Sequence, residues 1–313
     1  MVIIERDLQM KLKRSIFVTG ISLFLVSILS LEAAAANKKD FKKLKKTNEC
    51  VECDLTEANL QKANKGDLAG ANLAGADLTG ANLEKVNLAG ANLSGANLSG
   101  AVMKRANLTG ANLEGATLIN VNAYKAIFSG TNLSHAVLSG GMFMDVKWVS
   151  ATMTEANLSG AELNWGDFTD ADMTDATLPE ADVRSSHLVR TNLTRANLTG
   201  INLWQTILTD ANMTDANLTN VFAEQPSFVG ANLAGANITG ADLRRADMSR
   251  VDLTNANLSA ADFSLADFQD ADLSGANLTE TKLTRAGMIG TNLTNVVYCR
   301  TIMTDDSVNN PDC

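Results

Sequence analysis

Proline, histidine and aromatic residues are scarce in this chain. Its 313 residues include only three Pro and two His, and 5% are aromatic. This composition favours one repetitive domain over two globular domains. The two histidines, His135 and His187, fall in no Ser-His-Asp or Cys-His arrangement, and the sequence has no phosphate-binding loop. We therefore expect a protein that is not an enzyme and that binds no cofactor and no metal ion.

What the chain does contain is a five-residue repeat, as in ANLSGANLSG at residues 91–100. Every residue from Leu68 to Met303 whose number ends in 3 or 8 belongs to one uninterrupted series of 48, of which 29 are Leu. Two positions earlier in each repeat, 30 of the 48 residues are Ala. This internal repeat determines the interpretation of the whole chain.

A period of five matches neither an α-helix nor a pleated strand. It fits a chain that turns a corner every five residues, with one large and one small side chain pointing inward and three side chains pointing outward. Four such sides form a square coil of about 20 residues, which stacks on the next coil at a spacing of about 4.8 Å. The repeats then predict about 12 coils and a rod roughly 58 Å long.

The aromatic residues support a four-sided coil. The series that runs from Leu68 in steps of 20 contains five aromatic residues, whereas the series from Leu78 is Leu throughout except Ile238 and Tyr298. Aromatic side chains therefore concentrate on one interior wall and avoid the opposite wall. A five-residue period alone would not produce this difference between walls.

The A-[ND]-L-[ST]-G series resembles the pentapeptide-repeat family, whose fold is an all-β, right-handed quadrilateral β-helix. The resemblance covers residues 66–305 without a break and residues 54–62 less regularly. It implies a β-helix over residues 54–305, followed by a C-terminal tail at 306–313. It indicates no particular activity, because solenoids carry their function on their surfaces.

Residues 1–36 are typical of an export signal peptide. Three basic residues at 11–14 precede an apolar run at 15–31 and then a stretch of small residues. We expect cleavage after Ala35 or Ala36, a true start at Met10, and a mature protein in the periplasm or the thylakoid lumen. The alternative is an uncleaved membrane anchor, although an apolar run of this length is near the lower limit for spanning a bilayer.

Residues 37–53 form a basic linker that we expect to act as an N-terminal cap. The linker contains six Lys and the apolar residues Phe41 and Leu44. A bare β-helix end exposes its core and its unpaired backbone edge, so Phe41 and Leu44 are candidates to cover the first coil. The lysines are also suited to peripheral contact with acidic lipid headgroups, a role that is compatible with capping.

The four cysteines lie in two groups, Cys50 and Cys53 before the rod and Cys299 and Cys313 at its far end. The expected rod separates the two groups too far for a disulfide between them. In an exported protein, Cys50–Cys53 and Cys299–Cys313 are therefore the expected pairs. A similar C-x-x-C-D-L start occurs in other exported members of the family and implies a cap feature. A metal or redox role is the weaker alternative, because a second ligand pair and a βαβ context are lacking.

One side of the expected rod is chemically varied, whereas two of the other sides are dominated by Ser and Thr and all three commonly carry Gly at the next position. We call this surface the varied side. It consists of the residue pairs 84–85, 104–105 and so on in steps of 20 to 244–245. Its aromatic and Arg residues are of the kind that interfaces favour, so we expect it to bind a protein partner, with neutral drift as the alternative. The candidate interaction residues are Lys85, Lys104, Arg105, Tyr124, Lys125, Met144, Trp165, Arg184, Trp204, Arg244 and Arg245.

Acidity supplies a second possible function. From Asp54 onward, 16 Lys and Arg oppose 29 Asp and Glu, a net charge of −13. Such an acidic rod resembles DNA-mimicking members of the family that act on topoisomerases in the cytoplasm. The export signal and the basic residues of the varied side oppose this interpretation, and nucleic acid is not an expected partner.

Two weaker possibilities concern the other sides of the rod. An outward ladder of Thr runs from Thr154 to Thr214 in steps of 20 and could bind glycan or ice, although Glu114 and Ala234 interrupt the pattern. The Asp-rich stretch at 167–176 offers only oxygen ligands for Ca²⁺.

The C-terminal end raises the question of what covers the last coil. Only TDDSVNNPDC follows Met303. Unless a Cys299–Cys313 bridge folds this tail over the end, Tyr298, Ile302 and Met303 leave an apolar edge. A homodimer through this end would hide that edge.

Overall fold

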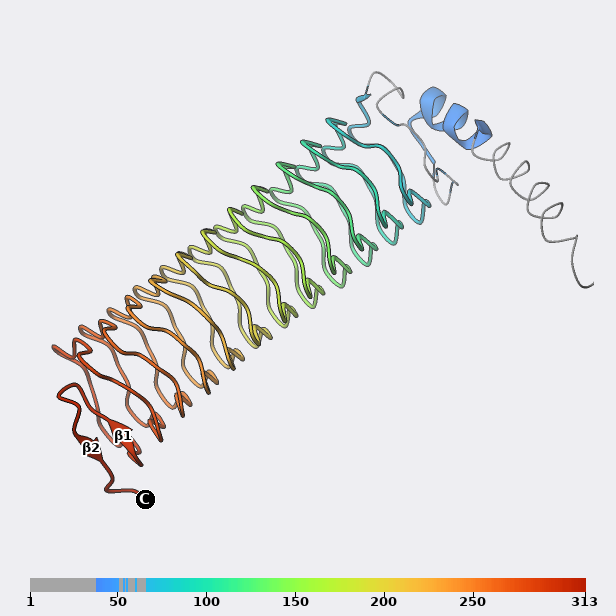
Figure 1. The fold of residues 1–313 in the computed structure, drawn as a ribbon. Coiled ribbons are helices and arrows are strands. Elements are labelled where there is room, and N and C mark those ends of the chain that lie inside the picture. The colour runs from blue at the N-terminus through green and yellow to red at the C-terminus, as the bar shows by residue number, and fades with distance from the viewer. Residues whose placement is uncertain (1–37, 51–52, 54, 56–59, 61–65) are drawn as a thin grey trace, which may run out of the picture.

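The computed structural model describes residues 38–50, 53, 55, 60 and 66–313. From residue 66 onward the chain winds into a long rod (Figure 1). Parallel backbone bridges join residues that are 20 positions apart, such as Asn92 with Asn112 and Asn97 with Thr117. One turn of the solenoid therefore holds four five-residue repeats, as the sequence predicts. The expected signal peptide at 1–36 lies outside the described residues.

The interior contains the two residue types that the repeat directs inward. Leu98 and Ala96, for example, are both fully buried, while Asn97 between them is half-buried. Successive coils are joined by backbone hydrogen bonds in both directions: Leu93 N donates to Asn112 O at 2.7 Å, and Asn92 N donates to Ala71 O at 2.9 Å. The backbone polar groups of the coils are thus paired, which is what burial of the walls requires.

The other three letters of the repeat form the corner. Asn97 Oδ1 accepts the backbone N–H of Ser99 at 3.1 Å and its hydroxyl at 2.7 Å, which fixes the start of the turn. Gly100 then takes a φ of 67°, a left-handed conformation in which Gly is not strained. Asp fills the same acceptor role elsewhere, as Asp77 Oδ1 does for Thr79.

Large aromatic side chains stack along one interior wall. The Trp148 ring lies 4.6 Å from the Phe128 ring and 5.7 Å from the Phe168 ring, measured between centroids, and all three residues are buried. Phe143 packs against this stack from the adjacent wall, 5.2 Å from Trp148. These contacts between residues 20 apart explain why the aromatic residues gather in one series.

A short helix occupies the N-terminal end of the described chain, over residues 38–47. Leu44 is fully buried in the core and Phe41 packs against it, while the six lysines are exposed. The Cys50–Cys53 disulfide follows the helix. No helix among the described residues is long and apolar enough to cross a membrane.

The C-terminal end is partly closed by its own tail. Strand β1 (Thr301–Ile302) pairs with strand β2 (Val308–Asn309) in antiparallel orientation, and the Cys299–Cys313 disulfide ties the tail to the last coil. Asp312 accepts the backbone N–H of Tyr298 at 2.8 Å and donates its own N–H to Tyr298 O. The tail thus satisfies backbone groups at this edge, and Tyr298 and Met303 are partly buried against the core.

Candidate functional site: the varied side

The 20-residue coil stacks the pairs of the varied side into one line along the rod. The second residue of each pair stands at the corner where φ is positive, with values of 60° at Lys85 and 59° at Trp165. Side chains at these corners point away from the core, because the walls are formed by the neighbouring Leu and Ala positions. The varied side is therefore an accessible strip.

Basic residues occupy the end of this strip nearest the N-terminus. Lys85, Lys104 and Arg105 are exposed, and the Lys85 ammonium lies 3.1 Å from a carboxylate oxygen of Glu84. These three residues are several coils away from the tryptophans, so the structure does not bring them into one site.

Tyr124 and Lys125 form a small cluster on the next coil. The Lys125 ammonium lies 5.2 Å from the centre of the Tyr124 ring and 3.3 Å from a carboxylate oxygen of Asp145. The hydrogen bond with Tyr124, followed by that with Asp145, raises the pKa of Lys125. Met144, on the coil between this cluster and Trp165, is half-buried.

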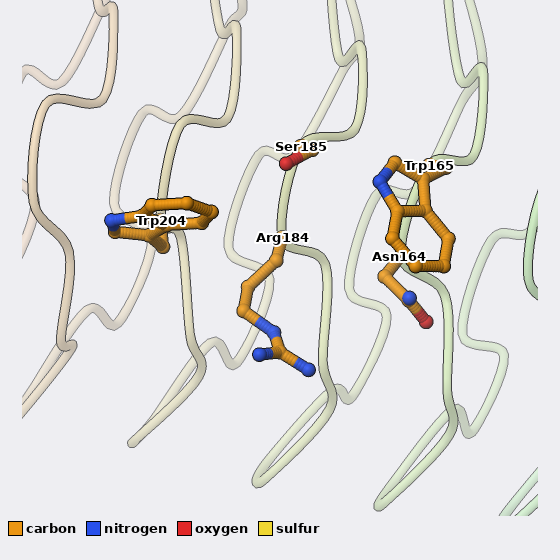
Figure 2. Close-up of a pocket in the computed structure, with 5 residues that line it drawn as sticks. All are labelled: Asn164, Trp165, Arg184, Ser185 and Trp204. Atoms are coloured by element: carbon orange, nitrogen blue, oxygen red, sulfur yellow. The ribbon is translucent and has the colours of Figure 1, made fainter.

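Three of the candidate residues meet in one pocket of about 150 Å³. Trp165 and Trp204 stand on opposite sides of Arg184, each from a different coil (Figure 2). The indole side chains are prominent, with 60% of Trp165 and 40% of Trp204 exposed. Ser185 and Asn164 complete the lining.

The charge of Arg184 is compensated within its own coil. Its Nε donates to Asp182 Oδ1 at 2.8 Å and its Nη2 donates to Asp182 Oδ2 at 2.6 Å, a two-pronged contact. The hydrogen bonds to Asp182, assisted by the charge of that carboxylate, raise the pKa of Arg184. The guanidinium is consequently held in position and carries little net charge into the pocket.

Asn164 is unusual among the outward residues because its side chain is buried. Only 6% of the residue is exposed, and its carboxamide makes no hydrogen bond to any residue that the structure describes. Among the described residues, Trp148 Nε1 alone is a fully buried side-chain polar atom without a partner, so the Asn164 carboxamide is accessible from the pocket that it lines.

Arg244 and Arg245 end the strip at the C-terminal side. Arg244 pairs with Asp242 in the same coil, and this contact raises its pKa. Arg245 Nη1 lies 3.2 Å from a carboxylate oxygen of Glu224 on the preceding coil.

Two residues beside the pocket were not among the candidates from sequence. Phe222 is 50% exposed, although it occupies a repeat position that is usually Asn or Asp. Its backbone bridges to Asn202, two residues before Trp204, so it adds apolar surface to the coil that follows Trp204, outside the lining of the pocket. The sequence did contain a signal for Phe222, because an aromatic residue stands there at a repeat position that is usually Asn or Asp. Asn164 gave no such signal, because a polar residue at an outward position is expected.

The Asp-rich stretch at 167–176 is engaged in contacts within the rod. Asp170 pairs with Arg190 and Asp175 pairs with Arg195, and these hydrogen bonds lower the pKa of both carboxyl groups. In the part of the chain that the structure describes, no group of three or more His, Cys, Asp or Glu side chains is placed to hold a metal ion.

The sequence matches the family model for pentapeptide repeats in eight copies, over residues 67–105, 101–140, 145–175, 186–222, 227–264 and 261–297. The chain belongs to the pentapeptide-repeat family. No curated protein gave a match.

Several solved pentapeptide-repeat proteins are similar to this family member. HetL from the cyanobacterium Nostoc, involved in regulating heterocyst differentiation, is 28% identical over 72% of this chain and 92% of its own, with a TM-score of 0.25. QnrB1, a plasmid-mediated fluoroquinolone resistance protein, is 18% identical over 66% of this chain and 90% of its own, with a TM-score of 0.29. A pentapeptide-repeat protein from the thylakoid lumen of Arabidopsis thaliana is 22% identical over 49% of this chain and 69% of its own, with a TM-score of 0.16.

Proposed function

We propose that this protein is an exported, non-catalytic scaffold that binds a protein partner through the varied side. The observation that carries the proposal is that Trp165 and Trp204, both substantially exposed, line one pocket on either side of Arg184. Exposed aromatic residues beside an Arg are the composition of energetically important interface centres. Other exposed apolar residues, such as Leu265 and Ile289, are not part of the lining of this pocket.

The solenoid suits such a role because it is a rigid support. Each coil contacts only its neighbours, so surface residues can differ from coil to coil without disturbing the interior. We further propose that the rod is right-handed, as the family resemblance implies. We also propose that it has about 12 coils, in keeping with the 20-residue bridging period. A rigid surface lowers the entropy that is lost on binding.

Location in the periplasm or the thylakoid lumen is part of the proposal. It is supported by the signal-like residues 1–36 and by two disulfides, Cys50–Cys53 and Cys299–Cys313, which persist in oxidising compartments. The partner is accordingly sought among exported proteins.

The proposal is tested by quantitative affinity capture from the exported fraction of the source cells. The comparison is between the wild-type rod, the double variant Trp165→Gly/Trp204→Thr and the matched control Thr154→Ser/Thr214→Ser on another side. The expected result is a protein retained by the wild type and the control at equal yield and lost from the double variant. A protein retained equally by all three rods would overturn the assignment of the varied side.

A further inference from the structure

We propose that the pocket between Trp165 and Trp204 binds an extended, proline-containing segment in the polyproline II conformation. This inference rests on the proposed function, since it specifies which part of the protein partner the varied side recognises. It follows from three properties of the pocket: its hydrogen-bonding groups, its charge and its dimensions.

The pocket offers mainly hydrogen-bond donors. The indole N–H of Trp165 is a donor only and lies on the side of its ring toward Ser185, whereas the indole nitrogen of Trp204 points away from Arg184 (Figure 2). Arg184 is a donor only, with an Nη1 group that makes no hydrogen bond to the described residues. Asn164 lines the pocket with a carboxamide, which donates through Nδ2 and accepts through Oδ1. The complementary ligand is therefore rich in acceptors. A proline-rich segment fits this requirement, because its backbone carbonyls are free and its prolines have no N–H.

The pocket favours an uncharged ligand with apolar faces. The Asp182 carboxylate compensates the Arg184 charge, so the pocket does not attract a carboxylate strongly. The indole faces of Trp165 and Trp204 are exposed on either side of the guanidinium (Figure 2). Pyrrolidine rings are neutral and flat enough to pack on such faces, which is how aromatic-lined grooves recognise proline-rich segments.

The spacing of the two tryptophans also matches polyproline II. They lie on coils that are two steps apart, which corresponds to roughly 9.6 Å along the rod. A polyproline II helix rises about 9.3 Å in its three-residue turn. Two prolines separated by three positions can therefore contact both rings while the residues between them present carbonyls to Arg184 and Asn164.

The direct test uses decaproline as the probe and the indole N–H signals of the full-length protein as the readout. The chain has three Trp, and the buried Trp148 serves as an internal control. In the ¹⁵N-labelled protein, decaproline is expected to shift the signals of Trp165 and Trp204 in a saturable manner and to leave Trp148 unchanged. Asn164→Ser is expected to weaken binding several-fold, and Trp204→Thr about tenfold or more, whereas Thr214→Ser leaves it unchanged.

Other outcomes would overturn the inference. Absence of saturable shifts with decaproline contradicts it, as does an equal response to a length-matched Gly-Ser peptide. Saturable shifts with cellohexaose but not with decaproline would assign the pocket to a glycan instead. The affinity capture separates failure of this inference from failure of the proposed function. If the wild type still retains a partner that Trp165→Gly/Trp204→Thr loses, the protein-binding function holds even though the proline-containing ligand is wrong.

Discussion

At the outward corners of the coil, backbone conformation constrains a residue more than packing does. Trp165 takes a φ of 59°, in the left-handed region that costs an ordinary L-residue about 1–2 kcal/mol. Because 60% of this Trp is exposed, burial of its ring offsets little of the conformational cost of the positive φ. The fold therefore gives no packing reason for a bulky aromatic residue at this corner, which agrees with the proposed interface.

Replacing both tryptophans by residues common at their corners should therefore leave the rod stable. Trp165→Gly relieves the left-handed strain at the cost of Gly backbone entropy. Trp204→Thr gains a hydroxyl contact of the kind that joins Thr199 to Asn197 at 2.6 Å. We expect the free energy of unfolding in urea to change by less than about 1 kcal/mol. A loss of more than twice that amount would show that the two rings support the fold itself.

Trp148, unlike Trp165 and Trp204, is buried and packs in the interior of the rod. Trp148→Phe keeps a ring between Phe128 and Phe168 and removes a buried Nε1–H that has no partner among the described residues. The lost packing and the removed desolvation penalty offset each other, so the free energy of unfolding should fall by less than about 1.5 kcal/mol. Trp148→Ala should cost about 3–5 kcal/mol. Equal losses from both variants would indicate that the indole N–H is hydrogen-bonded in solution.

At the scale of the coil, the sequence allowed most of the fold to be predicted. The positions of Leu98 and Ala96 in the interior follow from the strict five-residue period, which directs the same two positions of every repeat inward. The disulfide partners followed from the length of the rod, which keeps Cys53 and Cys313 at opposite ends. These predictions succeeded because a solenoid repeats one local rule.

The non-repetitive parts were less predictable. The segment over 38–47 forms a helix, whereas its sequence indicated only a basic linker with Phe41 and Leu44 as capping residues. Two apolar residues three positions apart are too few to establish a helical period. The burial of Asn164 was also not predictable, because its position in the repeat points outward and carries exposed or half-buried residues in the other coils.

The C-terminal tail is an element whose contribution can be measured directly. Cys313→Ser opens a bridge with a sequence separation of 14, and loops of about this size contribute about 3 kcal/mol in the chain-entropy estimate. Since coils contact only their neighbours, we expect faster hydrogen exchange at Tyr298 and Arg300 and no change over residues 91–200. The matched variant Cys53→Ser should affect the other end alone. Faster exchange along the whole rod would contradict this local role.

For the whole molecule, the first prediction concerns location. Intact mass and N-terminal sequencing of the native protein after cell fractionation should show a product beginning near Ala36 or Asn37 in the exported fraction. A full-length product in the cytoplasm would contradict export and would make a topoisomerase inhibition assay the next experiment.

The central claim is that one of the four sides of the rod carries the interaction. It can be tested by placing the photo-reactive residue benzoylphenylalanine in turn at Gln205, Asp210, Asp215 and Asn220, the four corners of one coil. These positions are well matched, because all four are exposed and their φ values lie between 53° and 56°. Crosslinking in the source cells is predicted to yield a discrete partner adduct from Gln205 and none from the other three. An adduct of equal yield from all four corners, or from a different corner only, would contradict the account.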